Sequence, residues 1–237
     1  MTRRDEIREK ALKDLQRYEV LMLNGHFDFG NGYHGAVYLN PHQLFRYPST
    51  IWRFAQDLLD VLPPSVVEAT EVVTGPVTGG ALLAHTIAGL LDSRRAITRP
   101  PTLFAPLTLD TDPGGLKASG YRGLDTDPRD LKASGDRGKS SGDRGHTLTR
   151  FYERQVAGKE ALVVDDVRNT GQTQASCVEL VRKAGGHVLA TAEIYDRMEA
   201  IVDAGVPNVA LAEYKAPDNY PADACPLCRA GMSVTAF

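Results

Sequence analysis

Apolar residues recur along this 237-residue chain at two different spacings. A spacing of three to four residues is typical of amphipathic helices, whereas short unbroken apolar runs that end at polar or glycine-containing turns indicate buried strands. The helical spacing predicts helices at 5–23, 51–62, 79–91 and 173–186. The apolar runs predict strands at 71–75, 102–107, 161–166, 187–195 and 208–214. Because strands alternate with helices, we expect an α/β fold with a parallel sheet and right-handed crossovers.

Three side chains in the predicted helices are expected to pack in the core. Trp52 and Phe54 are the aromatic residues of the apolar helix at 51–62. Cys177 lies on the helix at 173–186, and a free cysteine on a helix behaves as a small apolar residue.

A duplicated segment interrupts the alternation of strands and helices. The stretch LDTDPGGLKASGYRG at 109–123 is followed by LDTDPRDLKASGDRG at 124–138, and a shorter echo extends it to residue 145. Across 109–145, seven aspartates and seven lysines or arginines leave few large apolar side chains. Such a composition does not offset the ordering entropy of the backbone, roughly 1–2 kcal/mol per residue. We therefore expect a mobile loop insertion, and a functionally neutral surface insertion is an equally open interpretation.

Overall composition narrows the class of protein. A hydrophobic content of 42% and a charged content of 24% are ordinary for a globular protein, and a net charge of −3 gives no general reason to expect a nucleic-acid partner. No apolar run approaches the ~20 residues that a membrane span needs. The first residues, MTRRDEIREKALKDLQRYEVLML, are charged and helix-patterned and lack the apolar core of a secretion signal. We expect a cytoplasmic protein without membrane or nucleic-acid partners.

Two glycine-containing loops follow predicted strands and precede predicted helices. GPVTGG at 75–80 follows the strand at 71–75, and VRNTGQT at 167–173 follows the strand at 161–166. Ligands of open parallel sheets bind at the carboxyl ends of the strands, and the first N–H groups of a helix favour an anion there. Glycine permits close approach, while threonine and asparagine add hydrogen-bond donors. Both loops suit phosphate groups.

Two adjacent acids, Asp165 and Asp166, lead into the second loop. Carboxylates accept hydrogen bonds from sugar hydroxyls, so acids beside a phosphate loop suit a ribose 5-phosphate. Neither loop contains G-x-x-x-x-G-K-[ST], and GPVTGG lacks G-x-G-x-x-G, which argues against a P-loop and a dinucleotide fold. A simple helix-capping role for the acids is the alternative.

Four stretches resemble a known family. ALVVDDVRNTGQT at 161–173 resembles the phosphoribosyl-pyrophosphate (PRPP) signature of type I phosphoribosyltransferases, and VVTGPVTGGALLA at 72–84 is similar to their pyrophosphate-binding loop. HFDFGNGYHGAVYLN at 26–40 resembles the N-terminal hood of the orotate-specific members. EIYDRMEAIVDAGV at 193–206 resembles their strand that ends in Asp-Arg. Together these similarities cover most of residues 20–215 apart from the repeats.

The resemblance implies the type I phosphoribosyltransferase fold, a parallel twisted sheet flanked by helices, with a small hood and a long mobile loop insertion. It implies one domain over residues 1–237, in which the hood occupies about 1–50 and the repeats 109–145. A tail with a C-x-x-C pair follows at 216–237.

The resemblance also implies transfer of ribose 5-phosphate from PRPP to orotate, with Mg²⁺ bound mainly through PRPP and the chain working as a homodimer. The PRPP-binding residues would be Val77, Thr78, Gly79, Asp165, Asp166, Val167, Arg168, Asn169, Thr170, Gly171, Gln172 and Thr173. The base-binding residues would be Phe29, Asn169 and Arg197. Asp165 and Asp166 would also be catalytic, together with a lysine of the loop: Lys117, Lys132 or Lys139.

Some positions depart from the family pattern. Arg168 stands where an aliphatic residue is usual, Asn169 replaces a threonine, and Gly30 and Gly35 stand where lysine and serine often occur. Two alternatives therefore stay open: a phosphoribosyltransferase for another base, and a non-catalytic regulator that binds PRPP.

The pair Cys225 and Cys228 forms one C-x-x-C in the tail. One such pair supplies only two of the four ligands of a structural zinc site, so no metal ligands are assigned from the sequence. A pair of free thiols is the favoured interpretation, and a zinc site shared between subunits is the alternative. For His26 and His34 in the hood, base contact and simple solvation are equally arguable.

Overall fold

The computed structural model describes residues 1–109, 146–199 and 202–236. The repeats between 110 and 145, with Lys117, Lys132 and Lys139, lie outside these ranges, so the loop interpretation and the lysine candidates remain predictions. No helix in the described ranges is both long enough and apolar enough to cross a membrane.

The elements follow the predicted order. The helices are α1 (Arg3–Arg17), α2 (Pro48–Val61), α3 (Pro64–Ala69), α4 (Gly79–Arg94), α5 (Arg150–Val156), α6 (Gln172–Lys183) and α7 (Pro226–Arg229), with 3-10 turns at Pro41–Phe45 and Ala222–Ala224. The longer strands are β5 (Val72–Pro76), β6 (Leu103–Leu109), β8 (Glu160–Arg168), β9 (His187–Asp196) and β10 (Asn208–Glu213). The short strands are β1 (Leu21–Met22), β2 (Phe27–Asp28), β3 (Tyr33–Gly35), β4 (Tyr38–Leu39), β7 (His146–Thr147), β11 (Tyr220–Pro221) and β12 (Thr235–Ala236).

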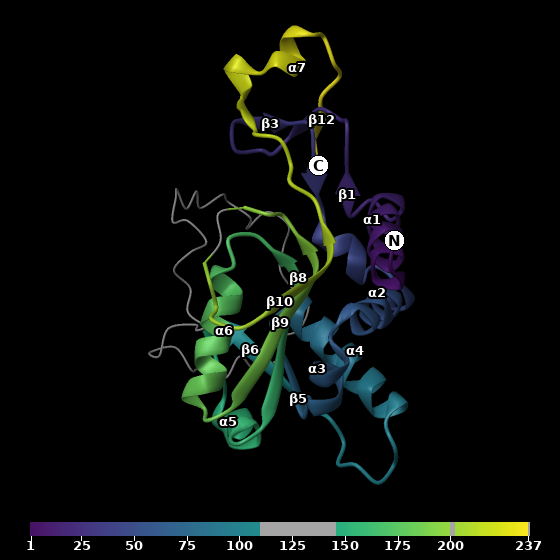
Figure 1. Ribbon diagram of the computed structural model, residues 1–237. Helices are drawn as coiled ribbons and strands as arrows, with labels where there is room; N and C mark the ends of the chain where they lie inside the picture. Colours follow the sequence, from purple (N-terminus) through teal and green to yellow (C-terminus); the bar gives the residue numbers. More distant parts are fainter. Residues whose placement is uncertain (110–145, 200–201, 237) are drawn as a thin grey trace, which may run out of the picture.

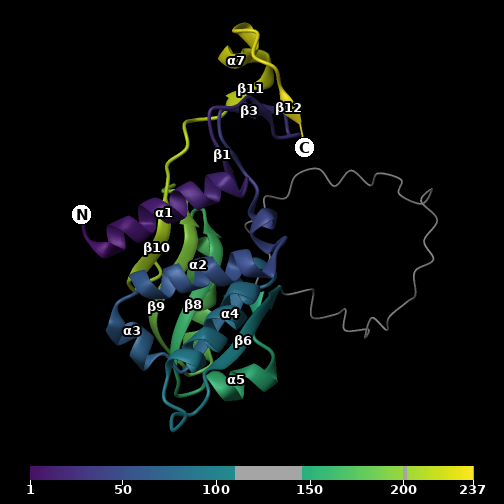
Figure 2. The ribbon, with the colours of Figure 1, turned by 90° about the vertical axis from the view of Figure 1, so that its right-hand side faces the viewer.

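The central sheet has the order β10-β9-β8-β5-β6-β7. Its first five strands are parallel, and β7 closes the edge antiparallel to β6. Helices α1, α2 and α4 lie on one side of this sheet and α5 and α6 on the other (Figures 1 and 2). The α/β prediction with a parallel sheet flanked by helices is confirmed.

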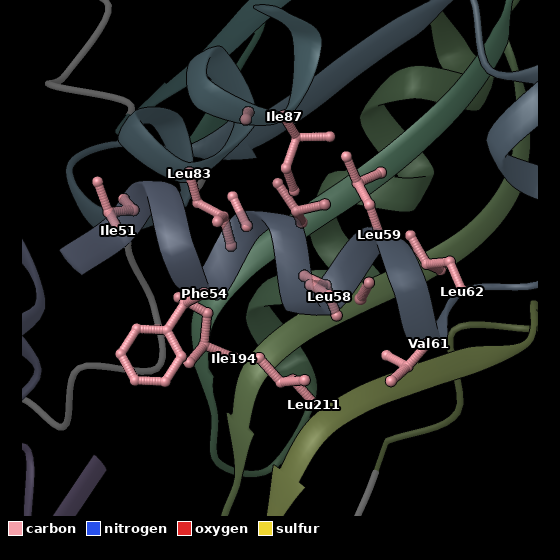
Figure 3. Packing of buried hydrophobic residues seen from close by; sticks show 14 of the residues in the cluster. Ile51, Phe54, Leu58, Leu59, Val61, Leu62, Leu83, Ile87, Ile194 and Leu211 are labelled. Carbon is pink, nitrogen blue, oxygen red and sulfur yellow. The ribbon is translucent and has the colours of Figure 1, made fainter. Parts of the chain in front are cut away.

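Each face of the sheet has its own apolar core. On the α2–α4 side, Leu58, Leu83 and Ile194 belong to one buried cluster (Figure 3). On the other side, Val163 and Cys177 belong to a second cluster. Burial on both faces explains why the strands read as continuous apolar runs rather than as alternating patterns. The prediction that Cys177 packs in the core is confirmed, because its side chain is fully buried.

Two local expectations were wrong. The first helix ends at Arg17 rather than at residue 23, because Glu19 adopts a left-handed conformation (φ 57°) that turns the chain into β1. Trp52 is 47% exposed, whereas Phe54 is buried as predicted. The buried stripe of α2 passes through Ile51 and Phe54 at helical spacing, and Trp52 falls outside it.

A second sheet, which we call the small sheet, joins the two ends of the chain. Its order is β11-β3-β2-β12, so it combines strands from residues 27–35 with strands from residues 220–236. It stands above the carboxyl ends of the central strands (Figures 1 and 2). Helix α1 instead packs against α2 and β10.

Candidate active site

The two glycine loops and the acid pair meet at one edge of the central sheet. Strands β5 and β8 are hydrogen-bonded neighbours, so the loops that follow them lie side by side. A Cβ atom at Gly79 would clash with the Asp166 carboxylate, and one at Gly80 would lie 3.0 Å from Asp165 Oδ1. A Cβ at Gly80 would also lie 2.8 Å from the Val164 carbonyl of the backbone, so glycine at this position lets the first loop pack directly against β8 and its acids. The site sits at the carboxyl ends of the strands, where the sequence places it.

The acids lie within β8, which continues to Arg168, rather than at its end. Asp165 is buried and Asp166 is partly exposed. Burial, and then the neighbouring Asp166 carboxylate, raise the pKa of Asp165 well above its ordinary value. The backbone N–H of Asp166 donates to Asp165 Oδ1, and that of Val167 to Asp166 Oδ1, each at 2.9 Å. Asp166 is thus the more accessible acceptor for a ligand hydroxyl.

The loop after the acids ends in an open helix terminus. Gly171, in the left-handed region at φ 82°, leads into α6. Within the described chain, the N-cap residues of α6 and α4 make no side-chain cap hydrogen bond, and neither helix has an acid in its first turn. The Gln172 N–H of α6 donates only a long hydrogen bond of 3.5 Å to Thr170 Oγ1. By contrast, Thr2 and Asp5 cap α1 through a reciprocal pair of hydrogen bonds. Uncapped N–H groups and the positive helix end at α6 are available to a phosphate group.

The loop between β5 and α4 offers fewer donors than the sequence analysis expected. The Val77 N–H already donates to the Leu107 carbonyl at 2.8 Å, which holds the loop against β6. Donation from the Val77 backbone to a ligand is therefore not supported. The backbone N–H groups of Thr78 and Gly79 remain the candidates.

A pocket of about 480 Å³ lies between the small sheet and the end of β9. Its lining residues are Phe29, Asn31, Tyr33, Val37, Tyr38, Leu39, Tyr195, Arg197, Ala216 and Asn219. Two of the predicted base-binding residues, Phe29 and Arg197, thus line one pocket. The third, Asn169, adjoins it, because Arg197 Nη1 donates to Asn169 Oδ1 at 3.3 Å. The phenyl ring of Phe29 stacks on Tyr38 with an interplanar angle of 11°.

No family model matches the chain. Its sequence is 28% identical over 225 residues to an orotate phosphoribosyltransferase of Caldanaerobacter subterraneus, covering 95% of this chain and 94% of the relative. The crystal structure of orotate phosphoribosyltransferase from Aeropyrum pernix superposes with a TM-score of 0.53 at 20% identity, covering 85% of this chain and 92% of that one. An adenine phosphoribosyltransferase from Trypanosoma brucei, in complex with AMP, pyrophosphate and ribose-5-phosphate, gives 0.52 at 14% identity, covering 90% and 82%. The chain has a type I phosphoribosyltransferase fold.

This phosphoribosyltransferase fold carries a buried polar network beneath the acids that the sequence analysis missed. Glu193, fully buried on β9, stands in register beside Asp165 on β8. It accepts hydrogen bonds from Gln174 Nε2 and Asn208 Nδ2, both at 2.8 Å. Burial raises the pKa of Glu193, and these two hydrogen bonds oppose the shift. A single acid inside the apolar run ATAEIY was the signal that could have revealed it.

Arg168, one of the departures from the family pattern, is held within the phosphoribosyltransferase scaffold. Its Nη1 forms an ion pair with Asp196 Oδ2 at 3.2 Å, and both side chains are largely buried. Its Nε is buried without a hydrogen-bond partner in the described part of the chain. The Arg197 N–H donates to the Arg168 carbonyl at 3.0 Å. The guanidinium of Arg168 thus links the end of β8 to the end of β9.

Proposed function

We propose that this protein is an orotate phosphoribosyltransferase of pyrimidine nucleotide biosynthesis. It transfers ribose 5-phosphate from PRPP to orotate, giving orotidine 5'-phosphate and pyrophosphate. One observation carries the proposal: the acid pair, the two glycine loops and a pocket containing Arg197 lie together at the carboxyl edge of the sheet. The similarity to orotate phosphoribosyltransferases over nearly the whole chain supports the choice of reaction.

Positioning and charge stabilisation supply most of the acceleration, because the reaction needs no protein nucleophile. Asp166 holds the ribose hydroxyls, with the buried Asp165 behind it. The loop from Asn169 to Gly171 and the first residues of α6 hold the 5-phosphate. Thr78 and Gly79 donate backbone hydrogen bonds to pyrophosphate.

The acid pair also fits a magnesium requirement. The partly exposed carboxylate of Asp166 offers the oxygen ligands that Mg²⁺ prefers, and this ion commonly binds through one or two carboxylates and substrate phosphates. Bound mainly through PRPP, Mg²⁺ would offset the charge on the departing pyrophosphate.

Arg197 favours a base that carries an acid group. Its guanidinium can contact a carboxylate through two parallel hydrogen bonds. In the present arrangement Nη2 pairs with Glu199 Oε1 at 2.8 Å, so an incoming carboxylate takes the place of the partly exposed Glu199. Phe29 lines the same pocket and offers an aromatic ring for a base.

The remaining assignments extend the proposal. The chain works as one domain, in the cytoplasm, as a homodimer. A lysine of the repeats, Lys117, Lys132 or Lys139, closes over pyrophosphate. Asn169, in place of the family threonine, supports one second candidate function, the same chemistry on another base.

One assay tests the reaction and its acceptor. The purified protein is incubated with PRPP, Mg²⁺ and each member of a panel of free bases, and released pyrophosphate is measured. Release with orotate alone supports the proposal. If pyrophosphate is released only with a different base, that base is the acceptor instead of orotate. If PRPP binds and no pyrophosphate is released with any base, the protein is a regulator.

A further inference from the structure

Four side chains from opposite ends of the sequence gather in the small sheet. His26 directly precedes β2, His34 lies in β3, and Cys225 and Cys228 belong to the turn of α7. One nitrogen of each histidine and the two sulfurs all lie within 4.8 Å of one another. The sequence favours a pair of free thiols at Cys225 and Cys228, with a zinc site shared between subunits as the alternative, and the fold places two histidines of the same chain beside them.

The distances match a tetrahedral metal site. His26 Nε2 lies 3.0 Å from His34 Nδ1 and 3.5 Å from each cysteine sulfur. Cys228 Sγ lies 3.3 Å from His34 Nδ1. Zinc bonds of about 2.0–2.1 Å to nitrogen and about 2.3 Å to sulfur imply edges of about 3.3 Å between two nitrogens and about 3.5 Å between nitrogen and sulfur. Four of the six separations are therefore within about 0.3 Å of those of a tetrahedral Cys₂His₂ ligand set, and the other two are no longer than 4.8 Å.

The outer nitrogens of both rings point to oxygen acceptors. His26 Nδ1 lies 2.9 Å from the Met232 carbonyl, which can only accept, so Nδ1 carries the proton and Nε2 presents a lone pair. His34 Nε2 faces Asp28 Oδ1 at 4.0 Å, which is longer than a hydrogen bond, and His34 Nδ1 faces His26 Nε2. Across the 3.0 Å between the rings, a proton on His34 Nδ1 can be donated to His26 Nε2, and a metal ion bound by both nitrogens would replace that proton. Carbonyl and carboxylate partners of this kind orient metal-bound histidines.

In the described part of the chain, the small sheet buries few apolar side chains. Its strands have only two or three residues each. Among residues 26–35 and 219–236, the buried apolar side chains are Phe27 and Cys225, and neither belongs to the two core clusters. Sheets this small need a metal, a disulfide or a larger partner to be stable.

We propose that His26, His34, Cys225 and Cys228 bind one structural zinc ion within a single chain. Four protein ligands complete the tetrahedron, so the ion ties the C-terminal tail to the β2–β3 hairpin and leaves no position for substrate. The ion thereby takes over the role of an apolar core in the small sheet.

Metal analysis of the purified protein tests this proposal directly. Protein prepared without chelators should contain about one zinc ion per chain, measured by inductively coupled plasma mass spectrometry. Cys228→Ser and His34→Ala should lose most of it, whereas Cys177→Ala and His187→Ala, which change a cysteine and a histidine outside the cluster, should retain it. Cys228 is exposed, so its replacement removes little buried packing.

A second measurement covers variants that fail to fold. Wild-type protein stripped of metal and titrated with Co²⁺ should develop the intense visible absorption of tetrahedral cobalt with thiolate ligands, saturating at about one ion per chain. Stripping should also lower the melting temperature, and zinc should restore it. Metal-free protein with an unchanged melting temperature, or a Cys225–Cys228 disulfide in protein kept under reducing conditions, would overturn the proposal. Neither readout uses PRPP or a base, so failure here leaves the proposed reaction unaffected.

Discussion

The Arg197 guanidinium donates a hydrogen bond to Asn169 Oδ1 across 3.3 Å, which joins the end of β9 to the loop that follows the acid pair. This contact connects the proposed base pocket to the proposed phosphate site. If Arg197 holds the base, this contact places the base beside the ribose, and replacing Arg197 also removes the hydrogen bond to Asn169.

Replacing Arg197 should affect the base rather than PRPP. We expect Arg197→Ala to raise the KM for orotate by roughly 10- to 100-fold, because a charged hydrogen bond contributes about 1.5–3 kcal/mol. PRPP affinity, measured by calorimetry, should change little. Arg197→Lys should recover only part of the loss, because lysine does not reproduce the two-pronged contact. Equal weakening of both substrates would refute the assignment.

Replacing Glu199 should change the KM for orotate in the opposite direction to replacing Arg197. Glu199 competes with a base carboxylate for Arg197 Nη2, to which it lies 2.8 Å away. Glu199→Gln should lower the KM for orotate a few-fold, and steady-state kinetics would measure it. An increase in KM would show that Glu199 positions Arg197 instead of competing for it.

The two acids should respond differently to neutralisation. Asp166→Asn should reduce PRPP-dependent turnover by at least about 100-fold, the cost of losing one well-placed electrostatic contact in an active site. Calorimetric titration with PRPP and Mg²⁺ should show weaker binding. Wild-type rates in this variant would contradict the ribose role of Asp166.

Asp165→Asn should make the protein more stable at neutral pH. The folded-state pKa of Asp165 is raised, chiefly by burial, so folding favours its protonated form. The stability that protonated Asp165 gives to the folded protein is fully present below the ordinary aspartate pKa, about 3.9. This stability is lost as the pH rises through the pKa of Asp165 in the folded protein. Asparagine stays neutral and avoids that loss. The melting temperature of the variant should exceed that of the wild type increasingly from about pH 4 upwards, and an unchanged difference across that range would contradict the prediction.

Residues 110–145 can be deleted without changing the pairing of β6 with β7. Leu109 and His146 are paired neighbours on β6 and β7, so an Asn-Gly turn can replace residues 110–145. If this segment supplies the catalytic lysine, turnover should fall far more than PRPP affinity. Unchanged turnover would make the repeats a neutral insertion.

Loss of the proposed zinc should disturb the base pocket, if both proposals hold. The β2–β3 hairpin that the ion would anchor carries Phe29, Asn31 and Tyr33 into the pocket wall. Cys228→Ser should therefore raise the KM for orotate more than that for PRPP, and zinc should not restore it in this variant. Equal effects on both substrates would show a general loss of folding instead.

The sequence by itself determined the central sheet and the candidate PRPP site. Each strand, its glycine loop and the next helix are contiguous, and parallel strands bring their carboxyl ends to one edge, so local patterns sufficed to place Asp165, Asp166 and Gly79 together. The family resemblance added Phe29 and Arg197 as residues of one base site. The local sequence around each of them does not indicate that they lie in the same pocket.

Only the tertiary structure decided the contacts between distant segments. The two-residue strands of the small sheet have no readable periodicity, so nothing in the sequence brings His26 to Cys225, about two hundred positions away. The same holds for the pairing of Arg168 with Asp196 and for Glu193 with Asn208. Such contacts depend on the relative placement of packed elements, and local propensity does not specify that placement.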